Sequence, residues 1–274
     1  MPLLVLPFPA IDPILLEIGP FALRWYALAY IVGILLAWRY MRFVVQQEHL
    51  WGATKRPTPV DIDDFIVWAT FGIILGGRLG YVLFYNPAYY LANPVEALQL
   101  WSGGMSFHGG FLGTVVAMIL FAWRRQISIW RLFDLAGTAA PIGLFFGRIA
   151  NFINSELWGR PTDVPWAFVF PTGGPEPRHP SQLYEASLEG ILLFVVIAFL
   201  TFRFKLLRKP GFIAGAFACG YGIARCFVEF YRVPDPQLGY LAGFLTMGML
   251  LSLPMILIGA GVMIWAAKRQ PQRT

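Results

Sequence analysis

Charged residues are scarce in this chain of 274 residues: Asp, Glu, Lys and Arg make up 13% of it, whereas soluble domains carry about 25%. Hydrophobic residues make up 57%. This composition excludes a soluble globular domain and predicts an all-α polytopic membrane protein. In a soluble chain the net charge of +6 would suggest nucleic acid as a partner. Here membrane orientation explains it better, and we expect no nucleic-acid partner.

Cysteine, repeats and metal motifs are also lacking. The two cysteines, Cys219 and Cys226, stand seven positions apart on one expected helix, about 10 Å apart and too far for a disulfide. No internal repeat, HExxH motif or Cys/His cluster occurs, so we expect no metal and no other cofactor. Residues Met1–Pro20 contain several prolines and no basic residue, so we expect that they are not a signal peptide. We expect this segment to lie along the outer interface.

Apolar runs long enough to cross a bilayer, which takes about 20 residues at 1.5 Å each, occur seven times. The chain is therefore expected to form a single membrane domain over residues 1–274. Two outer excursions interrupt it: an arm at Asn86–Ser106, with a short interfacial helix at Val95–Trp101, and a small irregular cap at Asn154–Pro180. The predicted spans are Phe21–Trp38, Phe65–Tyr85, Phe107–Trp123, Leu132–Ile153, Leu183–Phe202, Gly211–Tyr231 and Tyr240–Ala267, the last with a kink at Pro254.

The basic residues predict an orientation. With the N-terminus outside and the C-terminus in the cytoplasm, 14 of the 21 basic residues, including every lysine, lie in cytoplasmic segments. This matches the positive-inside rule. The other seven are all arginines and need a different explanation.

Three of these arginines lie within or at the edge of spans: Arg78, Arg148 and Arg225. An arginine on a lipid-embedded helix costs at least about 2.5 kcal/mol on insertion scales, so such residues usually face a polar cavity. The guanidinium fork suits a phosphate or carboxylate. Other polar residues are expected at the same outer depth, which predicts one outward-open anion site. They are Arg24, His108, Asn151, Glu185, Glu189, Tyr221 and Glu229, whereas Asp134 lies near the inner end.

Helical spacing supports a shared site, because Tyr221, Arg225 and Glu229 stand at i, i+4 and i+8 and so share a helix face. The structural alternative is that Arg225 and Glu229 form a buried ion pair that holds helices together. Glycines beside the polar residues, as in Gly76–Gly80, are explained by close helix packing. His179, in the outer loop, is expected to be a structural hydrogen-bonding residue.

The stretch Gly147–Gly159, with the sequence GRIANFINSELWG, resembles the signature of bacterial prolipoprotein diacylglyceryl transferases. Ala150 departs from the glycine that is commoner there but is still small. The resemblance covers nearly the whole chain. Five further stretches agree in order: Leu23–Tyr26, Gly76–Tyr81, Met105–Gly110, Arg178–Glu185 and Arg225–Arg232.

The resemblance implies an enzyme of the bacterial cytoplasmic membrane that acts on phosphatidylglycerol and preprolipoproteins. It would transfer the diacylglyceryl group to the thiol of the lipobox cysteine, form a thioether and release glycerol 1-phosphate. The acceptor cysteine belongs to the substrate. Membrane lipid and the signal peptides of preprolipoproteins are thus the expected partners.

Residue roles follow from that reaction. Arg148 and Arg225 are expected to clamp the phosphate, with Glu229 orienting Arg225. His108 is the favoured base for the thiol, and Tyr26 and Tyr221 remain alternatives. The resemblance implies that a further set takes part in lipid binding or site architecture, namely Asn151, Asn154, Glu156 and Gly159, and the expected substrate-binding set also includes Tyr221 and Arg78.

Three other classes of membrane protein fit the sequence less well. A secondary transporter for an organic phosphate would also place arginines in a cavity, but such proteins usually show repeats and access from both faces. A structural or receptor protein would explain the ion pairs but not the signature. A rhomboid-like serine protease is disfavoured because no GxSG-like element accompanies His108. Two assays distinguish a transporter from a transferase. A transporter would move a solute across liposomes, whereas a transferase would increase the mass of a lipobox peptide.

Overall fold

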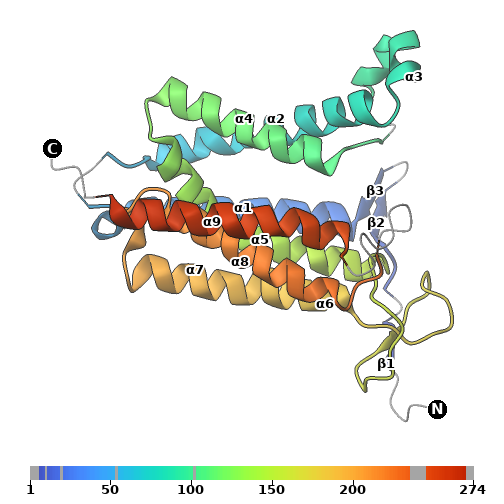
Figure 1. Ribbon diagram of the computed structural model, residues 1–274. Coiled ribbons are helices and arrows are strands. Elements are labelled where there is room, and N and C mark those ends of the chain that lie inside the picture. Colours follow the sequence, from blue (N-terminus) through green and yellow to red (C-terminus); the bar gives the residue numbers. More distant parts are fainter. Residues whose placement is uncertain are drawn as a thin grey trace.

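The computed structural model of the protein describes residues 6–9, 11–18, 21–52, 55–100, 103–234 and 245–269. Within these ranges seven helices are long and apolar enough to cross a membrane, which confirms the predicted fold class (Figure 1). They are α1 (Trp25–Gln46), α2 (Pro59–Phe84), α4 (Phe107–Arg125), α5 (Ile129–Ile153), the continuous span formed by α6 (Ser181–Glu185), the π-helical η4 (Ala186–Leu192) and α7 (Leu193–Phe202), then α8 (Phe212–Glu229) and α9 (Met247–Lys268).

Helix boundaries follow local capping chemistry. Thr58 and Asp61 form a capping box at the start of α2, which therefore begins at Pro59, six residues before the predicted start. Thr246 caps α9 by accepting a hydrogen bond from the Met249 amide. The predicted start of that span at Tyr240 lies outside the described residues.

Helices α2 and α4 form a pair that lies apart from the main bundle along most of its length (Figure 1). Glycines allow their backbones to approach closely. A Cβ added to Gly76 would lie 2.7 Å from the Gly113 Cα, and one added to Gly80 would lie 2.8 Å from the Gly109 Cα. These glycines are therefore a helix-packing surface, as expected for small residues in spans.

The main bundle is built around α5, which packs against α1 on one side and α8 on the other. α8 and α9 also meet through glycines, since a Cβ on Gly215 would lie 2.7 Å from the Gly259 carbonyl oxygen. At the start of α8 the buried Asp134 carboxylate accepts hydrogen bonds from the amides of Gly211 and Ala214, at 2.7 and 2.8 Å. The intramembrane carboxylate at this end thus caps a helix. Most of the fully buried core residues also lie toward this end: Val44, Val45, Leu50, Ile62, Leu132, Leu135, Leu207 and Ile213.

The two excursions contain short elements. The arm holds α3 (Pro87–Ala92) and the 3₁₀ turn η2 (Pro94–Leu98), close to the predicted interfacial helix, whose last residue, Trp101, is not among the described residues. Short strands were not predicted. β1 (Leu6–Pro7) pairs in parallel with β4 (Phe168–Val169) in the cap, and β2 (Ile14–Ile18) forms a hairpin with β3 (Phe21–Arg24) directly before α1. The first span therefore begins at Trp25, four residues after the predicted start.

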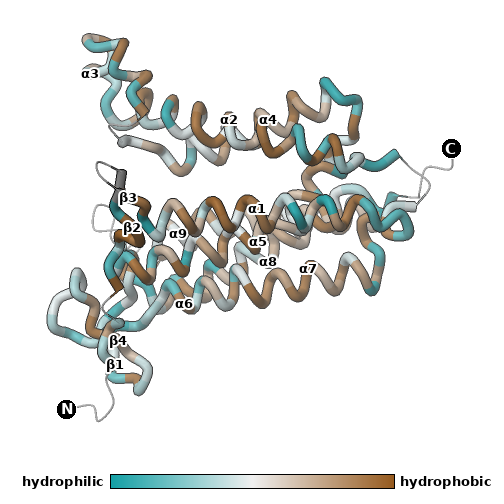
Figure 2. Tube along the Cα trace, turned by 180° about the vertical axis from the view of Figure 1, so that it is seen from behind, coloured by the Kyte–Doolittle hydropathy of each residue, from teal (hydrophilic) through white to brown (hydrophobic). Residues whose placement is uncertain are grey.

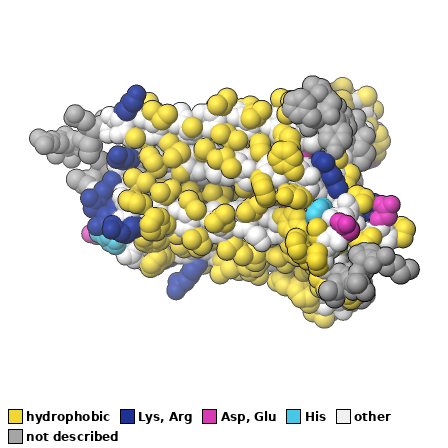
Figure 3. Space-filling view, turned by 60° about the horizontal axis from the view of Figure 1, so that its bottom comes forward, with side chains coloured by type: hydrophobic (Ala, Val, Ile, Leu, Met, Phe, Trp, Pro, Cys, Tyr) yellow, Lys and Arg dark blue, Asp and Glu magenta, His cyan; other side chains and the backbone are white. Residues whose placement is uncertain are grey.

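The hydropathy of the residues changes along the long axis of the molecule. Hydrophobic residues cover the helices, and hydrophilic residues gather at the two ends (Figure 2). In the face seen in Figure 3, most basic side chains cluster at the end where α9 finishes, beside a histidine and an acidic side chain, whereas most acidic side chains and another histidine lie at the opposite end. The short turns η1 (Glu48–Leu50) and η5 (Leu206–Arg208) belong to the basic end.

Candidate active site

Six charged side chains form one ion-pair cluster at the end of the bundle opposite the basic end. Glu185, at the end of α6, is its centre: its side chain is fully buried and pairs with three arginines. Arg232 Nη1 lies 2.8 Å from Glu185 Oε1, and Arg148 Nε lies 3.2 Å from Glu185 Oε2. The complete cluster is Arg148, Arg225, Arg232, Glu185, Glu189 and Glu229.

Arg148 also reaches a second carboxylate. Its Nη2 donates to Glu189 Oε2 at 3.3 Å, and the other Glu189 oxygen is buried without a hydrogen-bond partner in the described part of the chain. Tyr221 on α8 interacts electrostatically with both side chains. Arg148 and Tyr221, which the sequence assigns to one site, are therefore together.

Arg225 bridges Glu185 and Glu229, and each pair is in direct contact. Glu229 is held in turn by Arg232, whose Nε lies 3.4 Å from Glu229 Oε1, and by the Thr246 hydroxyl, which donates to Oε2 at 2.6 Å. The structural alternative of a buried Arg225–Glu229 pair is thus also correct. The two interpretations are compatible because the same pair orients the arginine.

Local structure explains how these residues meet. Glu185 and Glu189 lie at the junction of α6 and the π-helical η4, and π-helical turns often occur at functional sites. Gly190 allows this segment to approach α5, since a Cβ there would lie 2.7 Å from the Phe145 Cβ. The two carboxylates therefore face Arg148, near the end of α5.

The cluster contains three arginines and three glutamates, so its formal charge is zero when all six groups are ionised. This differs from the expected cationic clamp, in which the arginines are free for an anion. Each guanidinium carries five N–H donors. Among the described contacts, Nη1 of Arg148 and Nε of Arg225 have no partner, and the two side chains are 18% and 15% exposed. These donors are available to a ligand.

A second polar group adjoins the end of α5. The buried Asn151 donates from Nδ2 to Glu156 Oε1 at 2.7 Å. Tyr26, in the first turn of α1, interacts with both of these side chains and lies 3.2 Å from the Tyr30 hydroxyl, measured between oxygens. The Asn154 side-chain oxygen is buried without a hydrogen-bond partner in the described part of the chain. Of the predicted set, Tyr26, Asn151 and Glu156 are therefore neighbours.

The strap after α5, residues 154–159, reverses the chain with unusual backbone geometry. Ser155 and Leu157 have φ values of 55° and 58°, a region that residues other than glycine rarely adopt. Side chains from α6 hold it: Gln182 Nε2 donates to the Glu156 carbonyl at 2.6 Å and Ser181 Oγ to the Leu157 carbonyl at 2.8 Å. Such strain persists where the surrounding structure fixes it, often at functional sites.

Gly159 is packed between two backbones and is not open to a ligand. A Cβ there would lie 2.5 Å from the Tyr231 carbonyl oxygen and 2.8 Å from that of His179. Of the two roles expected for Gly159, lipid binding and site architecture, this close packing fits the second. His179 is the expected hydrogen-bonding residue, since its Nδ1 lies 3.0 Å from the Tyr184 hydroxyl. Burial and the charge of Arg160 lower the pKa of the His179 imidazole.

The assignment of Arg78 to the common anion site needs correction. Its guanidinium donates four hydrogen bonds to backbone carbonyls of the arm, including Ala97 at 2.8 Å and Glu96 at 2.7 Å. It also lies over the rings of Tyr81 and Tyr90. Arg78 is 5% exposed, and no contact joins it to Arg148 or Arg225 among the described residues. The arm's unsatisfied carbonyl groups explain this intramembrane arginine.

His108 is at the expected end of the bundle but outside the ion-pair cluster. It lies in the first turn of α4, exposed, with its ring packed edge-on to Phe107 at 5.6 Å between centroids. No hydrogen bond of its imidazole occurs within the described ranges.

Sequence reasoning missed three residues of this site. Arg232 completes the cluster. Arg160 Nε donates to the Arg232 carbonyl at 2.6 Å, and Gln182 holds the strap. The i, i+3 spacing of Glu229 and Arg232 is the one signal that could have indicated Arg232. The other contacts join segments far apart in the sequence.

Comparison with known proteins gives a consistent result. The family model described as "Prolipoprotein diacylglyceryl transferase" matches residues 13–265. The chain is 60% identical to "Phosphatidylglycerol--prolipoprotein diacylglyceryl transferase" of Rhizobium leguminosarum bv. trifolii (strain WSM2304), covering 98% of this chain and 96% of the relative. Identity to the protein of the same name from Rhizobium meliloti (strain 1021) is 59%, covering 97% and 95%. For that of Rhodopseudomonas palustris (strain ATCC BAA-98 / CGA009) it is 58%, covering 98% and 94%.

Proposed function

The chain belongs to the prolipoprotein diacylglyceryl transferase family, and on that premise we propose that the Arg148–Arg225 cluster is the place where it carries out the family's reaction. The enzyme transfers the diacylglyceryl group from phosphatidylglycerol to a prolipoprotein, the first step of lipoprotein maturation. The observation that carries the site assignment is the pair of partly exposed guanidinium groups held by fully buried carboxylates.

The reaction requires one bond to form and one to break. The sulfur of the lipobox cysteine attacks the primary glyceryl carbon of phosphatidylglycerol, a C–S bond forms and the C–O bond to phosphate breaks. Glycerol 1-phosphate leaves with the electron pair. The thiol proton must pass to a base, because the thiolate and not the thiol is the effective nucleophile.

The leaving phosphate gains negative charge, and fixed donors stabilise such charge better than mobile water does. Nη1 of Arg148 and Nε of Arg225 are proposed to donate to the phosphate oxygens. The glutamates keep these side chains in place, since each arginine already contacts two carboxylates. Glu229 thus positions Arg225.

The neighbouring group of Tyr26, Asn151 and Glu156 is proposed to bind the lipid head group. Asn151 lies one helical turn after Arg148 on α5, and its hydrogen bond to Glu156 ties it to the strap. The side-chain oxygen of Asn154, buried and without a partner among the described residues, adds an acceptor for a glycerol hydroxyl. The strap that carries Glu156 is fixed by Gln182, which would keep this group rigid.

His108 is proposed as the base because its imidazole is exposed and has no hydrogen-bond partner among the described residues. Tyr221 and Tyr26 are the alternatives. Tyr221 lies beside Arg148, and the Tyr26 hydroxyl interacts with Tyr30. For a thioether to form, the lipobox thiol would have to lie between α4 and the cluster.

We propose that the protein is a multi-pass protein of the bacterial cytoplasmic membrane with the cluster facing outward. The positions of the four lysines support this orientation, because all of them lie at the end of the bundle opposite the cluster. Lys55 stands before α2, Lys205 and Lys209 stand between α7 and α8, and Lys268 is the last residue of α9. Basic residues favour the cytoplasmic side.

The function is tested with purified protein, phosphatidylglycerol and a lipobox peptide, by the mass gain of the peptide. Arg148→Lys should lose about 10²–10³-fold in transfer rate, because lysine keeps the charge but not the guanidinium fork. Arg125→Lys is the matched control: it is also ion-paired, with Asp64, but at the other end of the bundle. No mass gain with the wild type would reject the function, and near-normal transfer by Arg148→Lys would reject the site.

The base is tested with His108→Asn. Transfer should fall by about 10²–10⁴-fold while lipid binding persists. The defect should shrink as the pH approaches about 8.5, where the thiol ionises without help. A defect that is constant with pH and accompanied by lost lipid affinity would remove His108 from this role and leave the two tyrosines.

A further inference from the structure

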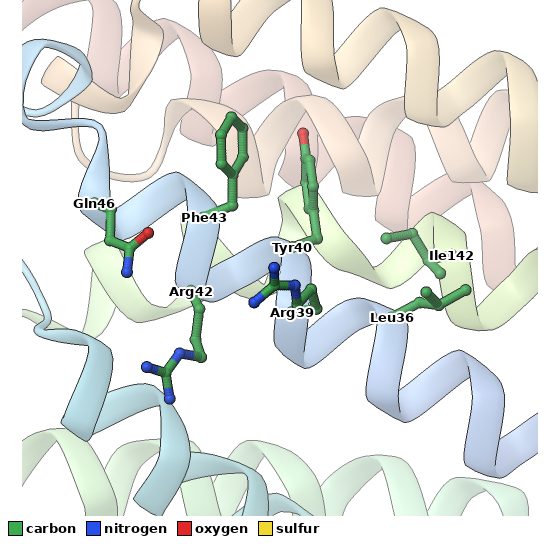
Figure 4. Close-up of a pocket in the computed structure, with 7 residues that line it drawn as sticks. All are labelled: Leu36, Arg39, Tyr40, Arg42, Phe43, Gln46 and Ile142. Carbon is green, nitrogen blue, oxygen red and sulfur yellow. The ribbon is translucent and has the colours of Figure 1, made fainter.

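A cavity of about 540 Å³ lies at the basic end of the bundle, away from the ion-pair cluster (Figure 4). Six of its lining residues come from the second half of α1 and one from the middle of α5. They are Leu36, Arg39, Tyr40, Arg42, Phe43, Gln46 and Ile142. The volume is typical of a small-molecule site.

The lining changes from apolar to polar along α1. Leu36 and Ile142 lie together at one end of the cavity, and the guanidinium groups and Gln46 lie toward the other (Figure 4). Leu36 and Gln46 are ten residues apart on one helix, which corresponds to about 15 Å along its axis. Half the hydrocarbon thickness of a bilayer is also about 15 Å. The cavity therefore spans the depth of one leaflet.

The two arginines differ in their partners. Arg42 pairs with Asp63, with Nη1 2.6 Å from Oδ2, and Trp38 donates to the same carboxylate at 2.7 Å. Arg39 is exposed and has no ion pair or hydrogen bond in the described part of the chain. It stands seven residues before the end of α1, or about 10 Å inside it. Its guanidinium group therefore has no fixed counter-charge among the described residues.

Aromatic rings form the remaining wall. Tyr40 packs on Phe194 and Phe43 on Phe202, with centroid separations of 5.1 and 6.1 Å. Tyr40 and Phe43 extend away from the guanidinium groups (Figure 4). Apart from the Tyr40 hydroxyl, the wall beside the cationic end is thus apolar and is suited to a hydrocarbon chain.

We propose that this cavity binds an anionic phospholipid of the leaflet at the basic end, with its phosphate on Arg39 and an acyl chain along Leu36 and Ile142. A phosphate supplies the missing counter-charge, and the graded lining fits a molecule that is charged at one end and apolar at the other. The positive-inside rule accounts for the side on which Arg39 lies but not for its place in the lining of a cavity that also contains Leu36 and Ile142.

The test uses the full-length protein in nanodiscs and a phosphatidic acid with a photoactivatable diazirine in its acyl chain. Phosphatidylglycerol is avoided because it would also occupy the catalytic site. Mass spectrometry should locate crosslinks at residues 36–46 of α1 and near Ile142, in excess over a phosphatidylcholine with the same chains. Arg39→Gln should reduce this labelling by about fivefold, the factor expected for one basic residue at an anionic membrane surface.

Two further variants complete the test. Arg203→Gln removes another exposed arginine from the same end, outside the lining of this cavity, and should leave the labelling unchanged. Leu36→Trp fills the apolar end without changing the charge and should also reduce labelling. Diacylglyceryl transfer should remain at the wild-type rate in Arg39→Gln. Equal labelling by the two lipids, or equal loss in both arginine variants, would overturn the proposal. Loss of the label on adding millimolar inorganic phosphate would instead assign the site to free phosphate.

Discussion

Replacing Glu185 by glutamine removes the charge at the centre of the ion-pair cluster. The side chain is fully buried and contacts Arg148, Arg225 and Arg232. Glutamine has nearly the same shape, so the substitution tests charge and not packing. The cluster would then carry three positive and two negative groups in a site with little access to water.

The expected cost follows from the burial. Removing one partner of a buried ion pair typically costs about 3–5 kcal/mol, because a charge remains without compensation. At about 2–4 °C per kcal/mol for a chain of this size, the unfolding midpoint should fall by roughly 10 °C. Diacylglyceryl transfer should fall as well, because Arg148 and Arg225 both lose a fixed partner.

A second substitution restores the charge balance. Arg232 contacts Glu185 at 2.8 Å and Glu229 at 3.4 Å but is not among the proposed phosphate donors. The double variant Glu185→Gln/Arg232→Gln should therefore be less destabilised than the sum of the two single variants. The coupling energy is expected to be about 1–3 kcal/mol.

The assay is thermal unfolding in detergent, followed by circular dichroism for both single variants and the double variant. Glu176→Gln is the control, since Glu176 is 62% exposed and lies 3.8 Å from Arg178; its effect should be below about 1 kcal/mol. A midpoint for Glu185→Gln within the range of that control would refute the reasoning. Strictly additive single effects would also refute it.

Three other outcomes are expected. A cysteine introduced at Gly173 should react with an impermeant maleimide added from outside, whereas one at Lys55 should not; the reverse pattern would invert the orientation. Gly113→Leu should separate α2 from α4 and cost at least about 1–3 kcal/mol of unfolding free energy, while Gly143→Ala, which has no neighbour within 4 Å of its new Cβ, should be nearly neutral. Asp134→Asn should lower the unfolding midpoint by the equivalent of about 1–2 kcal/mol, because the N-terminus of α8 loses a charged cap; an unchanged midpoint would contradict this role.

The spans could be predicted from the sequence because hydropathy and helix length act locally. The errors at the span ends also have local causes, such as the Thr58–Asp61 capping box that starts α2 early. The strands were not predictable. β1 and β4 are two residues each and are separated by some 160 residues, so no periodicity marks them.

The sequence indicated part of the candidate site, but neither its full set of residues nor its charge balance. Intramembrane arginines indicated a polar site, and the i, i+4 spacing placed Arg225 and Glu229 together. Glu185 forms ion pairs with three arginines because α6, α5, α8 and the segment after α8 meet in the folded protein, and the sequence does not show this meeting. Arg78 has the same residue type and depth as the other two, and only its backbone acceptors in the arm distinguish it.

The balanced cluster has a consequence for product release. Phosphatidylglycerol carries one negative charge on its phosphate, and the departing phosphate monoester carries up to two. Two arginines without neighbouring carboxylates would bind the doubly charged product more tightly than the singly charged substrate. Buried carboxylates beside the arginines repel the additional negative charge of the product and so weaken its binding. Glu189 is suited to this effect because it contacts Arg148 and has one oxygen without a hydrogen-bond partner in the described part of the chain. Glycerol 1-phosphate should therefore inhibit Glu189→Gln several-fold more strongly than the wild type in the transfer assay. Equal inhibition constants would mean that this carboxylate only supports Arg148 and does not favour release of the product.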